Sequence, residues 1–155
     1  MSKHVKPVPD GYHTVTPYLC LRNAGAAIEF YQKAFGAKEK LRMPGPGGKI
    51  MHAELQIGDS TIMLSDEFPE MSVQSPAALG GTPVSLLLYL ENVDRVFGQA
   101  IVAGAREIRP LKDQFYGDRS GTLEDPYGHK WTLSTHIEDV SPEEMQRRMM
   151  AATPA

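Results

Sequence analysis

Short runs of alternating apolar and polar residues recur along the chain, and two segments between them carry a helical pattern. Alternation predicts strands, whereas apolar residues spaced three and four apart predict a helix. The helical patterns lie between Asn23 and Gly36 and over residues 93–103. The predicted strands span residues 15–21, 39–43, 50–57 and 61–65 in the first half, and residues 84–90, 107–111, 117–124 and 130–136 in the second.

The two halves form an internal repeat. Leu21-Arg22-Asn23 has its counterpart in Leu90-Glu91-Asn92 after 69 positions, and Gly58 has its counterpart in Gly128 after 70. Each half places its Asn before the helical pattern, where an N-cap is expected. A repeat at a fixed offset indicates that one supersecondary unit occurs twice. Each half therefore predicts the order strand–helix–strand–strand–strand.

A unit of this kind has one helix, which covers only one face of its sheet, so the other face needs a second layer. We predict an α+β fold in which paired βαβββ modules form a curved mixed sheet around a cleft. Clefts between repeats are common ligand sites. The predicted parts are an N-terminal arm (1–13), a first module (14–66), a linker (67–82), a second module (83–137) and a C-terminal helix (141–152).

Composition narrows the classes of function. The chain has 155 residues, a net charge of −3 and one cysteine. The charge argues against a nucleic-acid partner, and the single cysteine excludes a disulfide framework or a cysteine-based zinc site. Cys20 is expected to act as a small buried apolar residue. No run approaches the roughly 20 apolar residues of a membrane span, and no targeting segment is visible, so we expect a soluble, cytoplasmic protein with no membrane partner.

Alternation along the strands also predicts which side chains face the cleft. On the strand over residues 50–57 it puts His52 and Glu54 together on the cleft face. The other predicted cleft residues are Thr16, Tyr18, Met63, Ser85, Tyr89, Thr132 and Ser134. These side chains are hydroxyls, a few apolar groups and one His–Glu pair, a mixture that suits a small-molecule ligand.

Tyr116 and Arg119 lie near a glycine-rich strand start and are added as candidate ligand-binding residues. Nearby glycines indicate bulges, so alternation does not decide which way these side chains face. Two roles fit Arg119. It either binds a carboxylate or phosphate of the ligand, or it pairs with Asp118 or Glu124.

Several separated motifs resemble one known superfamily. They include Ala27-Ile28-Glu29-Phe30-Tyr31, Met51-His52-Ala53-Glu54-Leu55 and the run from Glu124 through Pro126-Tyr127-Gly128-His129 to Trp131. The pattern, over about residues 14–150, resembles the vicinal oxygen chelate superfamily of glyoxalase I, extradiol dioxygenases and bleomycin- or fosfomycin-resistance proteins, and within it the PhnB-like branch. The resemblance implies paired βαβββ modules and commonly a homodimer. It implies no single reaction, because one fold hosts several chemistries.

The resemblance also implies where a metal would bind. Metal-dependent members carry four ligands, which correspond here to Thr16, Met63, Ser85 and Thr132. None of these side chains is a good ligand for a divalent metal, so we predict no metal and no other cofactor. An alternative is a relocated metal site in which His52 and Glu54 are joined by Asp66 or His136.

His52 and Glu54 fit two further roles. Glu54 either orients His52 in a structural hydrogen bond or tunes it as a general base. His129 and Trp131 have structural interpretations, the first in fixing a turn by hydrogen bonds and the second in the core beneath the second helix.

Three functions follow from these residues. The first is a metal-independent small-molecule binding protein that uses the cleft between the modules. The second is a lyase, isomerase or oxygenase acting on a small oxygenated substrate, with His52 and Glu54 as the catalytic pair. The third is a dimeric interaction or regulatory protein.

Overall fold

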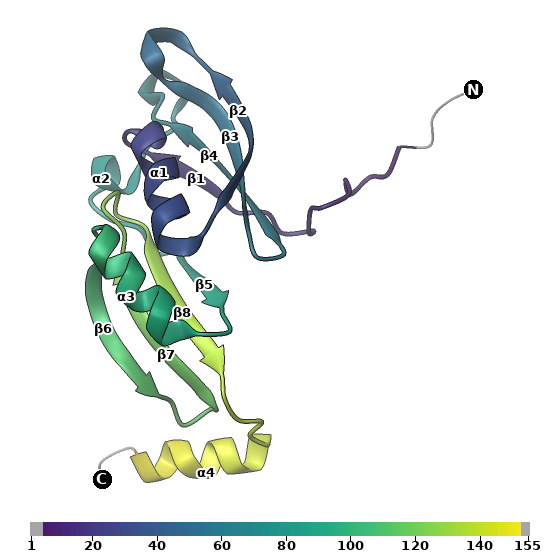
Figure 1. The fold of residues 1–155 in the computed structure, drawn as a ribbon, viewed down its shortest axis with the longest axis vertical. Helices are drawn as coiled ribbons and strands as arrows, with labels where there is room; N and C mark the ends of the chain where they lie inside the picture. The colour runs from purple at the N-terminus through teal and green to yellow at the C-terminus, as the bar shows by residue number, and fades with distance from the viewer. Residues whose placement is uncertain (1–4, 153–155) are drawn as a thin grey trace. The chain divides into compact units, whose positions relative to one another are not determined.

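The computed structural model describes residues 5–152, and the chain divides into two compact units, the first ending at Gly81 and the second beginning at Thr82 (Figure 1). The first four residues of the predicted arm lie outside the described residues. Within residues 5–152, no helix is long and apolar enough to cross a membrane.

The first unit contains a four-stranded sheet and one long helix. Its main elements are β1 (Tyr18–Leu21), α1 (Ala24–Phe35), β2 (Lys38–Pro44), β3 (Ile50–Ile57) and β4 (Ser60–Asp66). The strands are ordered β1-β4-β3-β2, and β1 pairs with β4 in parallel while the other pairs are antiparallel. Three short helices complete the unit, namely η1 (Pro46–Gly48), η2 (Pro69–Met71) and α2 (Pro76–Leu79).

The second unit repeats this topology. Its elements are β5 (Ser85–Tyr89), α3 (Val93–Ala103), β6 (Arg106–Asp113), β7 (Asp118–Glu124), β8 (Lys130–His136) and the added helix α4 (Pro142–Ala152). The order β5-β8-β7-β6, with β5 and β8 parallel, matches the first sheet strand for strand. The predicted α+β class with two βαβββ modules is therefore confirmed.

Helix boundaries follow from the residues that cap them. The side chain of Asn23 accepts a hydrogen bond from the Ala26 backbone N–H, and Asn92 does the same for Arg95. Both helices thus satisfy one of the donors that a first turn leaves without a partner. Gly36 ends α1 with a φ of 67°, a left-handed conformation in which glycine carries no side-chain penalty.

Helices α1 and α3 each pack on one face of the sheet of their own unit (Figure 1). Beneath α1, the buried side chains include Leu21, Leu55 and Leu64, and beneath α3 they include Leu133 and Trp131. Trp131 is only 1% exposed, which confirms its predicted place in the core. We call the face of each sheet opposite α1 or α3 its open face.

Two buried aspartates tie the ends of strands to neighbouring segments. Asp66 accepts hydrogen bonds from the backbone N–H of Ala24 (2.8 Å) and of Ile50 (2.7 Å), which joins β4 to the starts of α1 and β3. Asp125 accepts from the Trp131 indole N–H at 2.9 Å and from two backbone N–H groups of the β7–β8 turn, one of them that of His129. The turn next to His129 is thus organised by Asp125, with His129 contributing through its backbone.

The Asp125 contacts predict a large effect on stability. The Asp125→Ala variant leaves the buried Trp131 indole N–H and two part-buried backbone N–H groups without this acceptor, so we expect its free energy of unfolding to fall by about 3 kcal/mol. Urea denaturation followed by the fluorescence of Trp131, the sole tryptophan, measures this. Glu91→Ala, at an exposed position, is the matched control and should change the free energy by less than about 0.5 kcal/mol. Equal stability of the two variants would contradict the assigned role of Asp125.

Candidate functional site

The open face of the first sheet carries a chain of hydrogen bonds across three segments. The Tyr12 hydroxyl donates to Oε2 of Glu54, Oε1 of Glu54 lies 3.0 Å from Nε2 of His52, and Nδ1 of His52 lies 2.9 Å from the Tyr18 hydroxyl. An ionised carboxylate only accepts, so Nε2 of His52 donates to it. In a neutral imidazole with its proton on Nε2, Nδ1 accepts a hydrogen bond from the Tyr18 hydroxyl.

The same contacts shift the pKa values of Glu54 and Tyr12. The Tyr12 hydroxyl, followed by His52, lowers the pKa of Glu54 by hydrogen bonding to its carboxylate, against the opposing effect of burial. The same contact with Glu54 raises the pKa of Tyr12. Glu54 is 7% exposed and is therefore a buried, ionised carboxylate that holds His52 in one orientation.

Tyr12 reaches this site from the segment before β1, and sequence analysis did not select it. Thr61 donates to the Gly11 carbonyl at 2.9 Å, and the Lys40 ammonium lies 4.4 Å from the centre of the Tyr12 ring. These contacts hold the C-terminal end of the predicted arm against the sheet of the first unit. No local pattern identifies Tyr12, because its side chain contacts Lys40 and Glu54, which are more than 25 positions away in the chain.

A cavity of about 480 Å³ lies beside this hydrogen-bond chain. Tyr12, Thr16, Glu54 and Met63 line it, together with residues of the N-terminal segment. Met63 is paired directly with both Tyr18 and Glu54 in the sheet. The structure thus brings together five predicted residues of the first unit, namely Thr16, Tyr18, His52, Glu54 and Met63.

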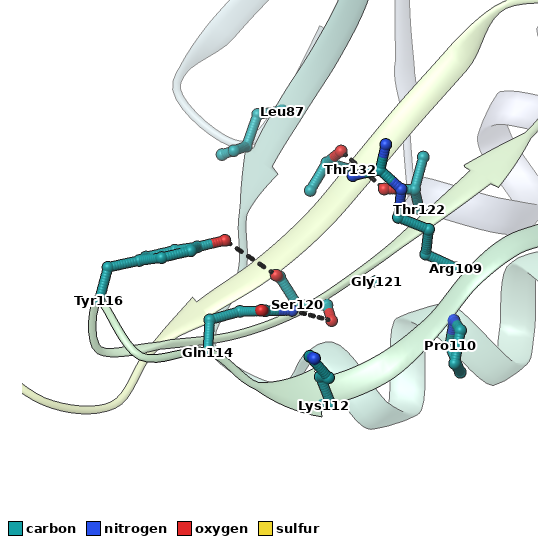
Figure 2. A pocket seen from close by; sticks show the side chains of 10 residues that line it. All are labelled: Leu87, Arg109, Pro110, Lys112, Gln114, Tyr116, Ser120, Gly121, Thr122 and Thr132. Carbon is teal, nitrogen blue, oxygen red and sulfur yellow. Dashed lines mark hydrogen bonds between the residues drawn. The ribbon is translucent and has the colours of Figure 1, made fainter. Parts of the chain in front are cut away.

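A larger cavity, of about 600 Å³, lies on the open face of the second sheet (Figure 2). All four strands and the β6–β7 turn contribute to its lining, which consists of Leu87, Arg109, Pro110, Lys112, Gln114, Tyr116, Ser120, Gly121, Thr122 and Thr132. Of these, Tyr116 and Thr132 were selected from the sequence. The Tyr116 hydroxyl lies 3.4 Å from that of Ser120, and the hydroxyls of Thr122 and Thr132 are 3.1 Å apart.

Tyr89 and Ser134 also lie on this open face but hold a buried carboxylate. Their hydroxyls donate to Oδ2 of Asp118, at 3.2 and 3.1 Å, while Nδ1 of His136 lies 2.7 Å from Oδ1. Nε2 of His136 contacts Asp139 at 2.8 Å, so a doubly protonated ring satisfies both carboxylates. Asp139, and then Asp118, raise the pKa of His136 by hydrogen bonding to its charged form.

Comparison with known proteins identifies the family. The model of the Glyoxalase/Bleomycin resistance protein/Dioxygenase superfamily matches residues 12–133. The chain belongs to this superfamily. The superfamily predicted from the motifs is thereby confirmed.

Individual relatives agree with this assignment. The uncharacterized protein Mb0911c of Mycobacterium bovis is 44% identical over 138 residues, which cover 87% of this chain and 91% of that protein. Protein PA1353 from Pseudomonas aeruginosa has the same fold, with a TM-score of 0.67, 24% identity and coverage of 81% and 99% of the two chains. A Bacillus cereus structure titled as a putative 3-demethylubiquinone-9 3-methyltransferase, PhnB protein, shares the fold with a TM-score of 0.58, 20% identity and coverage of 79% and 99%.

The four positions to which the resemblance assigned metal ligands carry side chains that do not fit a divalent metal. Thr16 donates its hydroxyl to the His13 carbonyl, Thr132 is paired with Thr122, and Met63 and Ser85 are equally poor ligands. Among the described residues, no three His, Cys, Asp or Glu side chains are grouped so that they could hold a metal ion. Asp66, the suggested third partner of His52 and Glu54, instead accepts two backbone N–H groups on the helix side of the sheet.

Arg119 does not pair with Asp118 or Glu124, so that alternative is wrong. Its guanidinium contacts Asp94 of α3 at 2.8 Å and Asp113 at 3.0 Å, on the helix side of the sheet. Arg119 therefore lies on the opposite face of the second sheet from the cavity of about 600 Å³. β7 pairs with β8 without a shift in register from Asp118 to Glu124, so the bulges that the nearby glycines suggested are absent from this strand.

Cys20 lies on β1 and contributes no reactive thiolate. Burial, together with the nearby Glu67 and Asp66 carboxylates, raises the pKa of its thiol to about 11. A thiol with this pKa stays protonated at neutral pH.

Removal of the Tyr12 hydroxyl should change the titration of Glu54. In Tyr12→Phe the largest influence that lowers the pKa of Glu54 is lost, so this pKa should rise toward its ordinary value of 4.5. An ionised Glu54 with a lowered pKa stabilises the fold above pH 4.5, and this stabilisation is lost as the pH falls through the folded-state pKa. In the variant, the contribution of Glu54 to the free energy of unfolding should therefore depend less on pH. NMR titration of the Glu54 carboxyl carbon measures the change.

The matched control for this experiment is Tyr116→Phe, which removes a hydroxyl from the other unit. It should leave the pKa of Glu54 unaltered. An unchanged Glu54 titration in Tyr12→Phe would show that the Tyr12 contact is absent in solution.

Proposed function

We propose that this superfamily member binds a small molecule without a metal ion, in the cavity on the open face of its second unit. The observation that carries the proposal is the 600 Å³ cavity, a size within the range of about 300–1,000 Å³ for small-molecule sites. The proposal places the ligand in a pocket that one unit forms by itself.

The lining residues favour a ligand with both polar and apolar parts. Leu87 is half exposed and Tyr116 is partly exposed, so both offer apolar surface to a ligand. Hydroxyls of Ser120, Thr122 and Thr132 lie around them and can donate or accept hydrogen bonds. A few polar groups placed around an apolar patch are typical of sites that bind and orient small molecules.

The donor chemistry supports binding without a metal. Threonine, serine and methionine stand at the four positions that correspond to metal ligands, and neutral hydroxyls and a thioether bind divalent ions weakly. Resemblance to the superfamily also supports a homodimer, which sedimentation equilibrium can test.

The hydrogen-bond chain in the first unit favours a second candidate function, an acid–base enzyme. Glu54 fixes the His52 ring so that Nδ1 faces the hydroxyl of Tyr18, which is 52% exposed. In this candidate, His52 exchanges a proton with Tyr18, and Tyr18 exchanges it with a small oxygenated substrate. A screen for lyase and isomerase activity tests it, and any activity that His52→Gln leaves unchanged excludes the proposed route.

The binding proposal is tested with a library of small oxygenated molecules, screened by ligand-observed NMR against protein dialysed with EDTA. We expect some compounds to bind in the presence of EDTA and to compete with one another for a single site. In Leu87→Trp the larger indole occupies part of the space that the ligand would fill, so dissociation constants should rise by about tenfold, a loss of about 1.4 kcal/mol of binding free energy.

Val102→Trp is the matched control, because Val102 lies on α3 and is 89% exposed. It should leave every dissociation constant unchanged. Binding that needs added zinc, nickel, manganese or iron would contradict the metal-independent proposal, and binding that Leu87→Trp does not weaken would place the ligand elsewhere.

A further inference from the structure

Arg109 and Lys112 both line the cavity of the second unit, although their spacing predicts that they face opposite ways. Side chains three positions apart on a regular strand lie on opposite faces of the sheet. Arg109 is paired with Thr122, however, and Lys112 is paired with Ser120. Three steps along β6 therefore match two steps along β7, which defines a β-bulge. The bulge turns both cations toward the cavity (Figure 2).

A proline and a glycine accommodate this bulge. Pro110, inside it, has no N–H to leave without a partner. Gly121 lies opposite, and a Cβ placed there would meet the Arg109 carbonyl oxygen at 3.0 Å, the Leu111 nitrogen at 3.0 Å and the Phe97 ring at 2.8 Å. The close approach of β6 to β7 thus requires glycine at position 121.

The two cations lack acidic partners. Among the described residues, neither Arg109 nor Lys112 takes part in an ion pair, and the lining of the cavity contains no carboxylate. Arg106, on the same strand, is by contrast paired with Glu124 at 3.1 Å.

Two acidic residues at the ends of β6 and β7, Asp113 and Asp118, are already engaged. Asp118 accepts hydrogen bonds from Tyr89 and Ser134 and contacts His136, and Asp113 pairs with Arg119 on the helix side. Two cations in a concave, partly apolar site produce a positive potential, which favours an anion. A planar guanidinium also matches the two oxygens of a carboxylate or phosphate.

We propose that the cavity of the second unit selects small molecules that carry a carboxylate or phosphate group, with Arg109 and Lys112 as the residues that bind this group. Leu87 and Tyr116 contact the apolar part of the same ligand. This inference rests on the proposed function and adds the chemical class of the ligand.

The test uses three probes with the same ring and different polar groups, namely phenyl phosphate, benzoate and benzyl alcohol. Titration calorimetry at low salt should show binding of at least one anion about tenfold tighter than that of benzyl alcohol, the gain expected of a charge-assisted hydrogen bond. The tighter of phenyl phosphate and benzoate identifies the preferred group. Raising the salt concentration to about 0.5 M should remove most of the difference, because salt screens exposed charges.

Variants assign the effect to the two cations. Arg109→Gln and Lys112→Gln should each weaken anion binding severalfold, and the double variant should bind anions no better than benzyl alcohol. Arg106→Gln is the matched control, because it removes a cation of the same strand that already has an acidic partner. It should leave the preference for anions in place. All three side chains are exposed, so circular dichroism should show the same fold throughout.

The outcomes separate this inference from the proposed function. Equal affinity for the anions and benzyl alcohol, anion binding that survives in the double variant, or no anion binding at millimolar concentration would overturn the anion inference. Neutral library compounds that bind to the unmodified protein and more weakly to Leu87→Trp would still support the proposed function. A library without any compound sensitive to Leu87→Trp would overturn both.

Discussion

One helix covers one face of each four-stranded sheet, and the position of every candidate site depends on this constraint. Alternate side chains of each central strand pack beneath the helix, as Leu55, Leu64, Leu123 and Leu133 do. The intervening side chains must then lie on the open face. Because the hydrophobic core occupies only one face, the other face can carry hydroxyls, a histidine and charged groups without loss of core packing.

The two open faces carry different charged side chains, although the two sheets have the same strand order. Met63 and Thr132 are 69 positions apart and occupy equivalent places in the repeat. Glu54 is paired with Met63, and Thr122 is paired with Thr132. A carboxylate in the first unit therefore corresponds to a hydroxyl in the second. The first unit uses its carboxylate to orient His52, whereas the second leaves the charge of Arg109 and Lys112 without an acidic partner among the described residues.

Sequence patterns worked best where a side chain's facing depends only on neighbours in one regular strand. His52, Glu54, Tyr18 and Met63 meet as alternation predicts, because β4 pairs with both β1 and β3 without a shift in register across Tyr18, Glu54 and Met63. The pattern failed where the register of β6 shifts, and it therefore did not select Arg109 or Lys112. The glycines near Arg119 left its direction undecided, although β7 is regular and Asp94 holds this side chain on the helix side.

The sequence by itself determined the family, through the resemblance of several separated motifs. It also determined the α+β class, the repeated order of elements and most of the buried face, because these depend on local periodicity and on capping residues such as Asn23 and Asn92. Only the tertiary structure decided which polar side chains meet. Tyr12 reaches Glu54 from 42 positions away, and Asp66 is occupied by Ala24 and Ile50 rather than by His52. These contacts depend on chain reversals, and the placement of Arg109 and Lys112 depends on a bulge in β6. The geometry of both is set by packing between distant segments and leaves no periodic signal in the sequence.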